Sequence, residues 1–324
     1  MFLVPDFKGH DFFPHGMRLP FMRFKLPCLI ASVVFSVLSI VLISVNGFNY
    51  GVDFKGGSMI EVRAKTGSAD VSDMRSTLSG LGLGDVQIQS LDTQGDVLIR
   101  VEQQPGEEEA QQAAAKKVLE ALGPDFELRR IEVVGPAVSS ELRTTGLIAV
   151  IASMVAIVLY VWFRFEWQFS VGVVVGLIHD VLITAGVFSL FWLQFDLSIV
   201  AALLTILGYS VNDSVVVADR IRENLRKYKK MPLNELLNVS INETLSRTIL
   251  TGVTTLIVLF ALFFLGGEVI RNFTFCMLFG VVLGTYSSVF ISAPLIDYLG
   301  ITRDWSGDAV KAPPSAGKQA ATGS

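Results

Sequence analysis

Charge and cysteine are both scarce in this sequence. Charged residues make up 17% of the 324 positions, hydrophobic residues make up 51%, and the mean hydropathy is +0.55. This composition is too apolar for an ordinary soluble domain. The two cysteines, Cys28 and Cys276, both fall in apolar runs, so neither a disulfide framework nor a cysteine metal site is indicated. The sequence therefore predicts a membrane protein whose cysteines are small buried hydrophobic residues.

Nucleotide-binding and hydrolytic motifs are missing as well. The sequence contains no GxxxxGK[ST] loop, no HExxH and no GxSxG, and the glycines of GVDFKGG follow a membrane span instead of opening a helix after a strand. We therefore expect no catalytic residue, no metal, no cofactor and no nucleic-acid partner. Any work must draw on another energy source, and a proton that crosses 100 mV supplies about 2.3 kcal/mol.

Six stretches approach the roughly 20 apolar residues that are needed to cross a bilayer. They cover residues 26–45, 146–163, 170–193, 197–218, 249–265 and 273–296. The first stretch begins too far from Met1 to resemble a cleaved signal peptide, and no small-residue cleavage site follows it. We interpret it as a retained anchor, so that residues 146–300 contain the other five spans.

Lysine and arginine gather on one side of these spans. If the N-terminus is inside, segment 1–25, residue 164, segment 219–247 and the tail are rich in basic residues, whereas the short external loops hold only Arg271. The long external loop 46–145 carries ten lysines and arginines, but it is left out of this count because large domains translocate largely regardless of charge. The positive-inside rule then places both termini in the cytoplasm. The tail 301–324 has the composition of a disordered cytoplasmic end.

Residues 46–145 form a separate domain on the external side. The pattern predicts strands at 58–64, 85–91, 95–102 and 125–134, and helices at 71–82 and 106–122. This order, βαββαβ, is the split ferredoxin-like pattern. We therefore expect a small α+β domain between the first and second membrane helices of an α-helical polytopic protein.

The pattern of segment 231–247 predicts an amphipathic helix. Leucine and isoleucine residues lie along one of its faces, and it follows the basic run RENLRKYKK. This combination favours an interfacial helix on the cytoplasmic surface of the membrane. A docking site for another protein is the alternative.

Small and polar residues recur at helical spacing in spans three to six. The stripes contain Gly172, Gly176, Asp180 and Thr184; Ala201, Thr205, Gly208 and Asn212; Thr248, Thr251, Gly252, Thr254 and Thr255; and Gly280, Gly284, Ser287 and Ser288. Small residues let membrane helices approach closely, so these spans should pack into a bundle.

Packing alone does not explain the acidic residues Asp180 and Asp213 within the spans. An acid or base at the centre of a membrane helix costs about 2.5 to 3.5 kcal/mol, so it needs a partner, water or a functional reason. Protonation would remove this cost. Arg247 directly precedes span five and enters from the same side as Asp213, so we expect these two residues to pair. An arginine that only extends to lipid phosphates is the alternative.

His179 directly precedes Asp180. Adjacent helical residues point about 100° apart, so the two side chains are not expected to face the same space. A hydrogen-bonded structural histidine is the favoured interpretation, and a proton carrier is the alternative.

Four segments resemble the SecF family of bacterial protein-export subunits. They are NYGVDFKGG (49–57), HDVLIT (179–184), GYSVNDSVVVADRIREN (208–224) and SRTILTGVTTL (246–256). They occur in the order and topological positions of that family, and the resemblance covers roughly residues 20–300. It implies a six-helix half bundle of the resistance-nodulation-division superfamily in the bacterial inner membrane.

The resemblance also implies partners and functional positions. The implied partners are a SecD-like subunit, the SecYEG channel, with YajC and YidC as further candidates, translocating unfolded polypeptide, protons and the lipid bilayer. The implied proton-coupling residues are Asp213, Arg247 and Asp180. Supporting positions in or beside these motifs are Asn212, His179, Tyr209, Thr248 and Gly208, and the implied hinge motif contains Gly51, Asp53, Gly56 and Gly57.

The mechanism that follows is a proton-driven motor. Charged Asp213 would pair with Arg247, and protonation would break the pair and shift the helices, moving the external domain through segments 46–57 and 135–145. Two other hypotheses remain open. A proton-coupled small-molecule transporter of the same superfamily would also use intramembrane acids, and a non-energetic assembly factor of the channel would tolerate their neutralisation.

Overall fold

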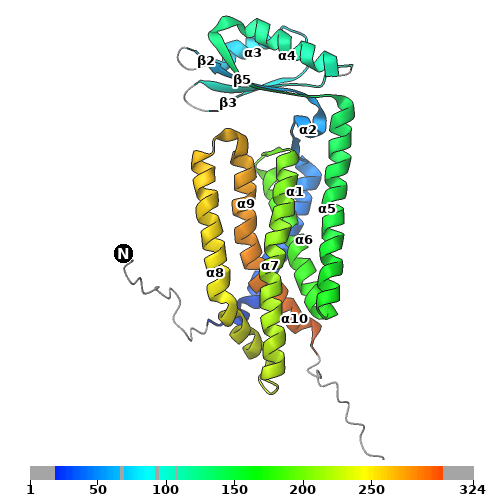
Figure 1. Cartoon of the computed structure of the whole chain (residues 1–324), viewed down its shortest axis with the longest axis vertical. Helices are drawn as coiled ribbons and strands as arrows, with labels where there is room; N and C mark the ends of the chain where they lie inside the picture. Colours follow the sequence, from blue (N-terminus) through cyan, green and yellow to red (C-terminus); the bar gives the residue numbers. More distant parts are fainter. Residues whose placement is uncertain (1–18, 66–68, 92–94, 107, 302–324) are drawn as a thin grey trace, which may run out of the picture.

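A helical bundle carries a small sheet domain at one end (Figure 1). This computed structural model describes residues 19–65, 69–91, 95–106 and 108–301. Within these ranges, six helices are long and apolar enough to cross a membrane, which confirms the six-span prediction. Most of the predicted N-terminal segment 1–25 and of the predicted disordered tail 301–324 lies outside the described residues. The end of the bundle next to the sheet is called the domain side below.

The sheet domain has the predicted βαββαβ order. Its elements are β2 (Gly57–Ala64), α3 (Val71–Ser79), β3 (Val86–Ser90), β4 (Asp96–Val101), α4 (Glu108–Leu122), a short 3-10 turn (Gly123–Asp125) and β5 (Phe126–Val134). The four strands pair in the order β3-β4-β2-β5, and every pairing is antiparallel. This is the connectivity of a ferredoxin-like fold, so the small α+β domain is confirmed.

The core of this domain lies between the sheet and its two helices. Alternation of side chains along the strands turns Ile60, Val62, Val97 and Ile99 to one face, where each is fully buried. Helices α3 and α4 cover that face, and the opposite face of the sheet is directed toward the bundle (Figure 1). Each such side chain contributes about 1.5 to 3 kcal/mol by its burial.

The bundle is built from three inner and three outer spans. Its elements are a 3-10 turn (Phe21–Phe24), α1 (Lys25–Asn46), α5 (Pro136–Arg164), α6 (Trp167–Leu190), α7 (Leu197–Lys227), α8 (Leu233–Leu265), α9 (Glu268–Ser287), a π-helical segment (Ser288–Ser292) and α10 (Ala293–Leu299). The apolar windows of α6, α7 and the last span are 50–56% buried, whereas those of α1, α5 and α8 are only 11–17% buried. The inner helices are therefore the ones that can hold a polar site away from lipid.

Helix α5 is longer than the apolar span that it contains. It begins at Pro136, directly after β5, and continues without a break to Arg164. Pro136 suits the first helical position because its missing N–H would have no partner there. All but the first residue of segment 135–145, which we expected to be a connection, is therefore helical, and a single continuous helix leads from the sheet domain through the bundle.

Helix α8 joins two segments that the sequence suggested were separate. It runs from Leu233 to Leu265, so the predicted amphipathic helix 231–247 and the fifth span form a single element. Leu236, Leu237 and Ile241 are fully buried against α7 and Met22. The apolar face of this segment therefore contacts protein, and not lipid as an interfacial helix would.

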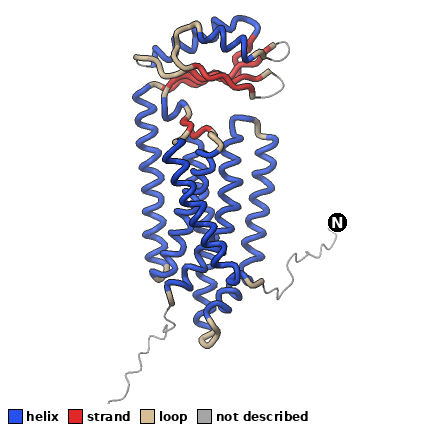
Figure 2. The backbone as a smooth tube through the Cα atoms, turned by 180° about the vertical axis from the view of Figure 1, so that it is seen from behind, coloured by secondary structure: helices blue, strands red, loops and turns tan. Residues whose placement is uncertain are grey.

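A short connection ties the sheet domain to the bundle on the domain side. Strand β1 (Asn49–Tyr50) pairs in parallel with β6 (Gln194–Phe195), which links the end of α1 to the loop between α6 and α7. Figure 2 shows this small sheet between the domain and the helices. Arg100 of β4 also donates a hydrogen bond to Gln194. The domain therefore contacts the bundle at several points besides its two chain connections.

Candidate functional site: a buried carboxylate network

Asp213 of α7 lies where three elements of the bundle meet. Asp213 is only 7% exposed, and each of its carboxylate oxygens accepts one hydrogen bond from a hydroxyl group. Thr248 of α8 donates to Oδ1 at 2.7 Å, and Ser288 of the π-helical segment donates to Oδ2 at 2.7 Å. Hydrogen bonds to an ionised group are the stronger kind, about 1.5 to 3 kcal/mol each. Asp213 thus connects α7 to both α8 and the last span.

Arg247 does not form the direct ion pair that we expected. Arg247 is exposed, and no ion pair joins it to Asp213 in the described part of the chain. Thr248, the next residue along α8, occupies the position facing Asp213. Because neighbouring helical residues point about 100° apart, Arg247 is turned away. Its charge still acts on Asp213 electrostatically.

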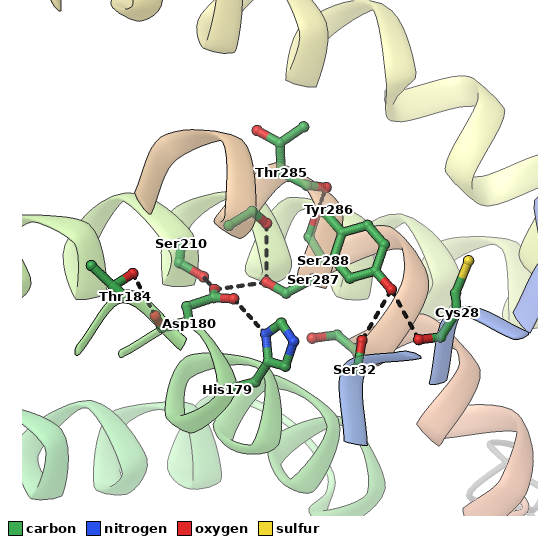
Figure 3. Close-up of polar contacts among 12 residues, drawn as sticks. Cys28, Ser32, His179, Asp180, Thr184, Ser210, Thr285, Tyr286, Ser287 and Ser288 are labelled. Carbon is green, nitrogen blue, oxygen red and sulfur yellow. Dashed lines mark hydrogen bonds and ion pairs between the residues drawn. The ribbon is translucent and has the colours of Figure 1, made fainter. Parts of the chain in front are cut away.

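Asp180 of α6 is fully buried. Its Oδ2 accepts hydrogen bonds from Ser210 of α7 at 2.6 Å and from Ser287 of α9 at 2.7 Å. Its Oδ1 lies 2.9 Å from Nδ1 of His179. Figure 3 shows these three groups converging on the carboxylate. The expectation that His179 and Asp180 face different spaces was therefore wrong, because the imidazole turns back toward its neighbour.

The polar contacts extend from His179 toward α1. The imidazole stacks on the ring of Tyr286 with the centroids 6.2 Å apart. The Tyr286 hydroxyl donates to the carbonyl oxygen of Cys28 at 2.9 Å and lies 3.0 Å from Oγ of Ser32 (Figure 3). His179 itself is 6% exposed, and its Nε2 has no hydrogen-bond partner among the described residues. A buried network thus connects α1, α6, α7 and α9.

Ser287 and Ser288 belong to this candidate site, although the sequence pattern indicates them only as packing positions. Both are completely buried, and each donates to a different carboxylate. The π-helical segment begins at Ser288, and π-bulges often occur at functional sites. Two adjacent serines inside an apolar span were the available signal, but their partners become visible only when α6 and α7 are in place.

Some predicted supporting residues lie away from this network. Gly208 and Asn212 are exposed, together with Ala201 and Thr205 of the same stripe, and nothing lies within 4 Å of a Cβ built on Gly208. This stripe therefore packs against no helix of the described chain. Tyr209 is half-buried. It lies beside Gly252 of α8, because a Cβ built on Gly252 would be 3.6 Å from the Tyr209 hydroxyl.

The residues expected to form a hinge make close contacts. Asp53, in the one-turn helix α2 (Val52–Lys55), accepts a hydrogen bond from the backbone N–H of Leu197 at 2.9 Å, at the start of α7. A Cβ on Gly51 would lie 2.8 Å from Nε2 of Gln194. Gly56 and Gly57 have φ of +75° and +111°, which other residues rarely adopt. The motif fixes the start of β2 against the bundle.

The described residues contain no group of three or more His, Cys, Asp or Glu side chains that could hold an ion. Both buried carboxylates accept hydrogen bonds from hydroxyl groups, and a carboxyl group in such a setting can gain and lose a proton.

Comparisons with known proteins define the class first. Residues 114–302 match the family described as protein export membrane protein SecD/SecF, C-terminal, and residues 41–67 match the SecD/SecF GG motif. The crystal structure of SecDF from Thermus thermophilus, a translocon-associated membrane protein, aligns with a TM-score of 0.77 at 37% identity. That alignment covers 88% of this chain and 39% of the SecDF chain.

The curated relatives narrow the class. Protein translocase subunit SecF of Rickettsia akari is 45% identical over 87% of this chain and 92% of its own, and SecF of Rhodobacter capsulatus is 44% identical over 93% and 92%. Protein translocase subunit SecDF of Brucella abortus is 41% identical over 92% of this chain and 40% of its own. The chain belongs to the SecF family of protein translocase subunits.

Proposed function

We propose that this chain is the SecF-like subunit of a bacterial protein-export motor, which uses the proton-motive force to drive late, ATP-independent movement of polypeptide through SecYEG. The family assignment supports the export role. The observation that carries the energy-coupling role is Asp213, a carboxylate buried among α7, α8 and the last span with one hydroxyl donor on each oxygen. Asp180 and Arg247 act with it.

The principal partner is a SecD-like subunit that packs against α7. SecD and SecF are fused in relatives named SecDF. The stripe Ala201, Thr205, Gly208 and Asn212 is exposed on α7, and a small, polar stripe suits contact with another helix better than contact with lipid. SecYEG is the channel partner, YajC and YidC are further candidates, and unfolded polypeptide is the substrate.

The protein lies in the bacterial inner membrane with both termini in the cytoplasm and the sheet domain in the periplasm. The distribution of lysine and arginine supports this orientation. The domain side of the bundle then faces the higher proton concentration. A proton from that side reaches Asp213, and the same proton leaves toward the cytoplasm in the next step.

In the coupling step, protonation changes the contacts that Asp213 of α7 makes with α8 and the last span. As a carboxylate it accepts hydrogen bonds from Thr248 and Ser288 and is stabilised by the charge of Arg247. The protonated form gains a donor and loses its charge, so its attraction to these groups weakens and the three elements shift. Since only Gly135 separates the end of β5 from the start of α5, movement of the bundle reaches the sheet domain through a short connection.

The test is Asp213→Asn, which keeps the size of the side chain and removes its titration. Export should be measured in vesicles that contain SecYEG, the SecD-like partner and this chain, with and without a proton-motive force. We expect the variant to lose the stimulation by the proton-motive force. Asp219→Asn, on the same helix, is the matched control because the Asp219 carboxylate is 56% exposed and pairs only with Arg164 among the described residues.

Two outcomes would favour the other functions. If Asp213→Asn exports as well as the unmodified protein while the complex still assembles, the chain is an assembly factor and not a motor. A proton-dependent flux of small solutes through the purified complex, with no effect on export, would indicate a transporter instead.

A further inference from the structure

Ser287 and Ser288 share an uncommon arrangement. They are neighbours in sequence, yet Ser287 donates to Asp180 on α6 and Ser288 donates to Asp213 on α7. Each hydroxyl also has a second acceptor in its own helix. Oγ of Ser287 lies 3.1 Å from the Gly284 carbonyl oxygen, and Oγ of Ser288 lies 3.0 Å from the Thr285 carbonyl oxygen.

A serine hydroxyl has one proton to donate and two lone pairs that accept. While the carboxyl is ionised, the hydroxyl proton points to the carboxylate oxygen. When the carboxyl is protonated, its own O–H donates to the serine oxygen, and the serine proton turns to the backbone carbonyl. Each serine can therefore satisfy either protonation state of its carboxyl by a rotation of one bond, and no buried donor is left without an acceptor.

His179 adds a third group whose state depends on Asp180. When Asp180 is ionised, Nδ1 of His179 carries the proton that it donates to Oδ1, and the unpartnered Nε2 is an acceptor. A proton on Oδ1 would require the other tautomer, with the proton on Nε2. The unpartnered Nε2 makes that alternative costly, so a proton arriving at Asp180 is directed to Oδ2, the oxygen that contacts Ser210 and Ser287.

The two carboxyl groups lie at different depths. Counted along their helices at 1.5 Å per residue, Asp180 is about 15 Å from the domain-side end of α6 and Asp213 is about 24 Å from the domain-side end of α7. A proton that enters from the domain side therefore meets Asp180 first. Ser287 and Ser288 occupy the single turn of the last span that contacts both acids, where the backbone changes to a π-helix.

We propose that Ser287 and Ser288 are positioning residues that couple the protonation of Asp180 to that of Asp213 through this turn. The inference rests on the proposed proton-driven function and specifies how its two acids communicate. Rotation of one hydroxyl away from its carboxylate changes the hydrogen bonding of the turn that holds the other hydroxyl. The two acids therefore titrate as a linked pair and not as independent groups.

Other titratable groups lie in the elements packed around the two carboxylates. They are His179 on α6, Tyr209 on α7, Arg247 on α8, Tyr286 on α9 and Cys28 on α1. None of them hydrogen-bonds Ser287 or Ser288, whose hydroxyls contact only the two carboxylates and the Gly284 and Thr285 carbonyl oxygens among the described residues. The effect of the serines can therefore be separated from theirs by substitution of the serines alone.

Infrared titration of the purified SecD-SecF complex in vesicles tests the coupling without reference to export. The carboxyl bands of Asp180 and Asp213 are assigned by their disappearance in Asp180→Asn and Asp213→Asn. With both serines present, Asp180→Asn should change the proton affinity of Asp213 by about tenfold, a shift of about one pH unit in its midpoint. With Ser287→Ala and Ser288→Ala, the same replacement should change it by less than about twofold.

Ser292→Ala is the matched control. Ser292 is 3% exposed and lies in the same π-helical segment, but its hydroxyl donates to the Gly172 carbonyl oxygen. This variant should keep the tenfold coupling, and Ser287→Thr with Ser288→Thr should restore it because threonine retains the hydroxyl. An equal loss of coupling in the Ser292 variant and in the double alanine variant would overturn the proposal. An Asp213 midpoint that does not change with Asp180→Asn when both serines are present would also overturn it. If the coupling is normal but export does not respond to the proton-motive force, the motor function is refuted and the proposed coupling of the two acids still holds.

Discussion

Replacement of Gly57 by alanine should destabilise the sheet domain far more than replacement of an ordinary turn glycine. Gly57 begins β2 with φ of +111°, and an alanine Cβ there would overlap the Val101 carbonyl oxygen. It would also lie 3.2 Å from the Gln103 nitrogen and 3.3 Å from the Glu102 carbonyl carbon. All three are backbone atoms of a paired strand or its end, so they cannot move aside as a flexible side chain would.

The magnitude follows from a comparison with Gly82. Gly82 has φ of +68°, and a Cβ added to it would have no atom within 4 Å, so Gly82→Ala should cost only the left-handed backbone term, about 1 to 2 kcal/mol. Gly57→Ala adds the overlap and should cost about 3 kcal/mol or more. A small domain has a total stability on the order of 5 to 15 kcal/mol, so this is a large fraction.

The assay is proteolysis of the intact protein in detergent across a urea series, with cleavage between α1 and α5 as the readout. We expect the cleavage midpoint of Gly57→Ala to lie well below that of Gly82→Ala, while helix content remains unchanged. Equal midpoints for the two variants would contradict this expectation, because they would show that close approach of the backbone to Gly57 contributes nothing.

Three further predictions concern charged groups. Arg63 hydrogen-bonds Asp96 through two nitrogens and thereby lowers the pKa of Asp96, so Asp96→Asn should cost up to about 1 kcal/mol at pH 7 for a partly exposed pair. A lowered pKa stabilises the fold above the unfolded value of about 3.9, so this difference should disappear as the pH of a urea titration falls below about 4. Arg247→Gln should leave the melting temperature within about 2 °C because the residue is exposed, yet it should abolish stimulation of export by the proton-motive force; normal stimulation would remove Arg247 from the mechanism. Asp53→Ala should increase hydrogen exchange at the Leu197 amide, its hydrogen-bond partner, and unchanged exchange would show that this contact does not join the domain to α7.

The elements of the fold were predictable because each has a simple period. Alternation at Val97 and Ile99 identified a half-buried strand, and the structure places β4 within a residue of the predicted ends. Long apolar runs identified the six spans. Hydropathy detects only the apolar part of a helix, however, so the polar first ten residues of α5 were not recognised as helical.

The partners of polar groups were predictable only in part. Asp180 and Asp213 stood out because acids in an apolar span are costly. Equal depth suggested that Arg247 meets Asp213, but depth does not fix the rotation of α8, and that rotation places Thr248 there instead. The same limit explains why Ser287 and Ser288 look like packing residues in the sequence, since their acceptors belong to helices more than 70 residues away.

A distance between the sheet domain and the bundle tests whether the charge of Asp213 sets the position of the sheet domain. Spin labels at exposed Glu120 on α4 and exposed Leu265 at the end of α8 would report their separation in the SecD-containing complex at two pH values, one on each side of the midpoint of the Asp213 infrared band. We predict two distance distributions in the unmodified protein and a single, pH-independent distribution in Asp213→Asn. The same pH-dependent change in both proteins would show that the domain moves without Asp213 and that the proposed coupling is wrong.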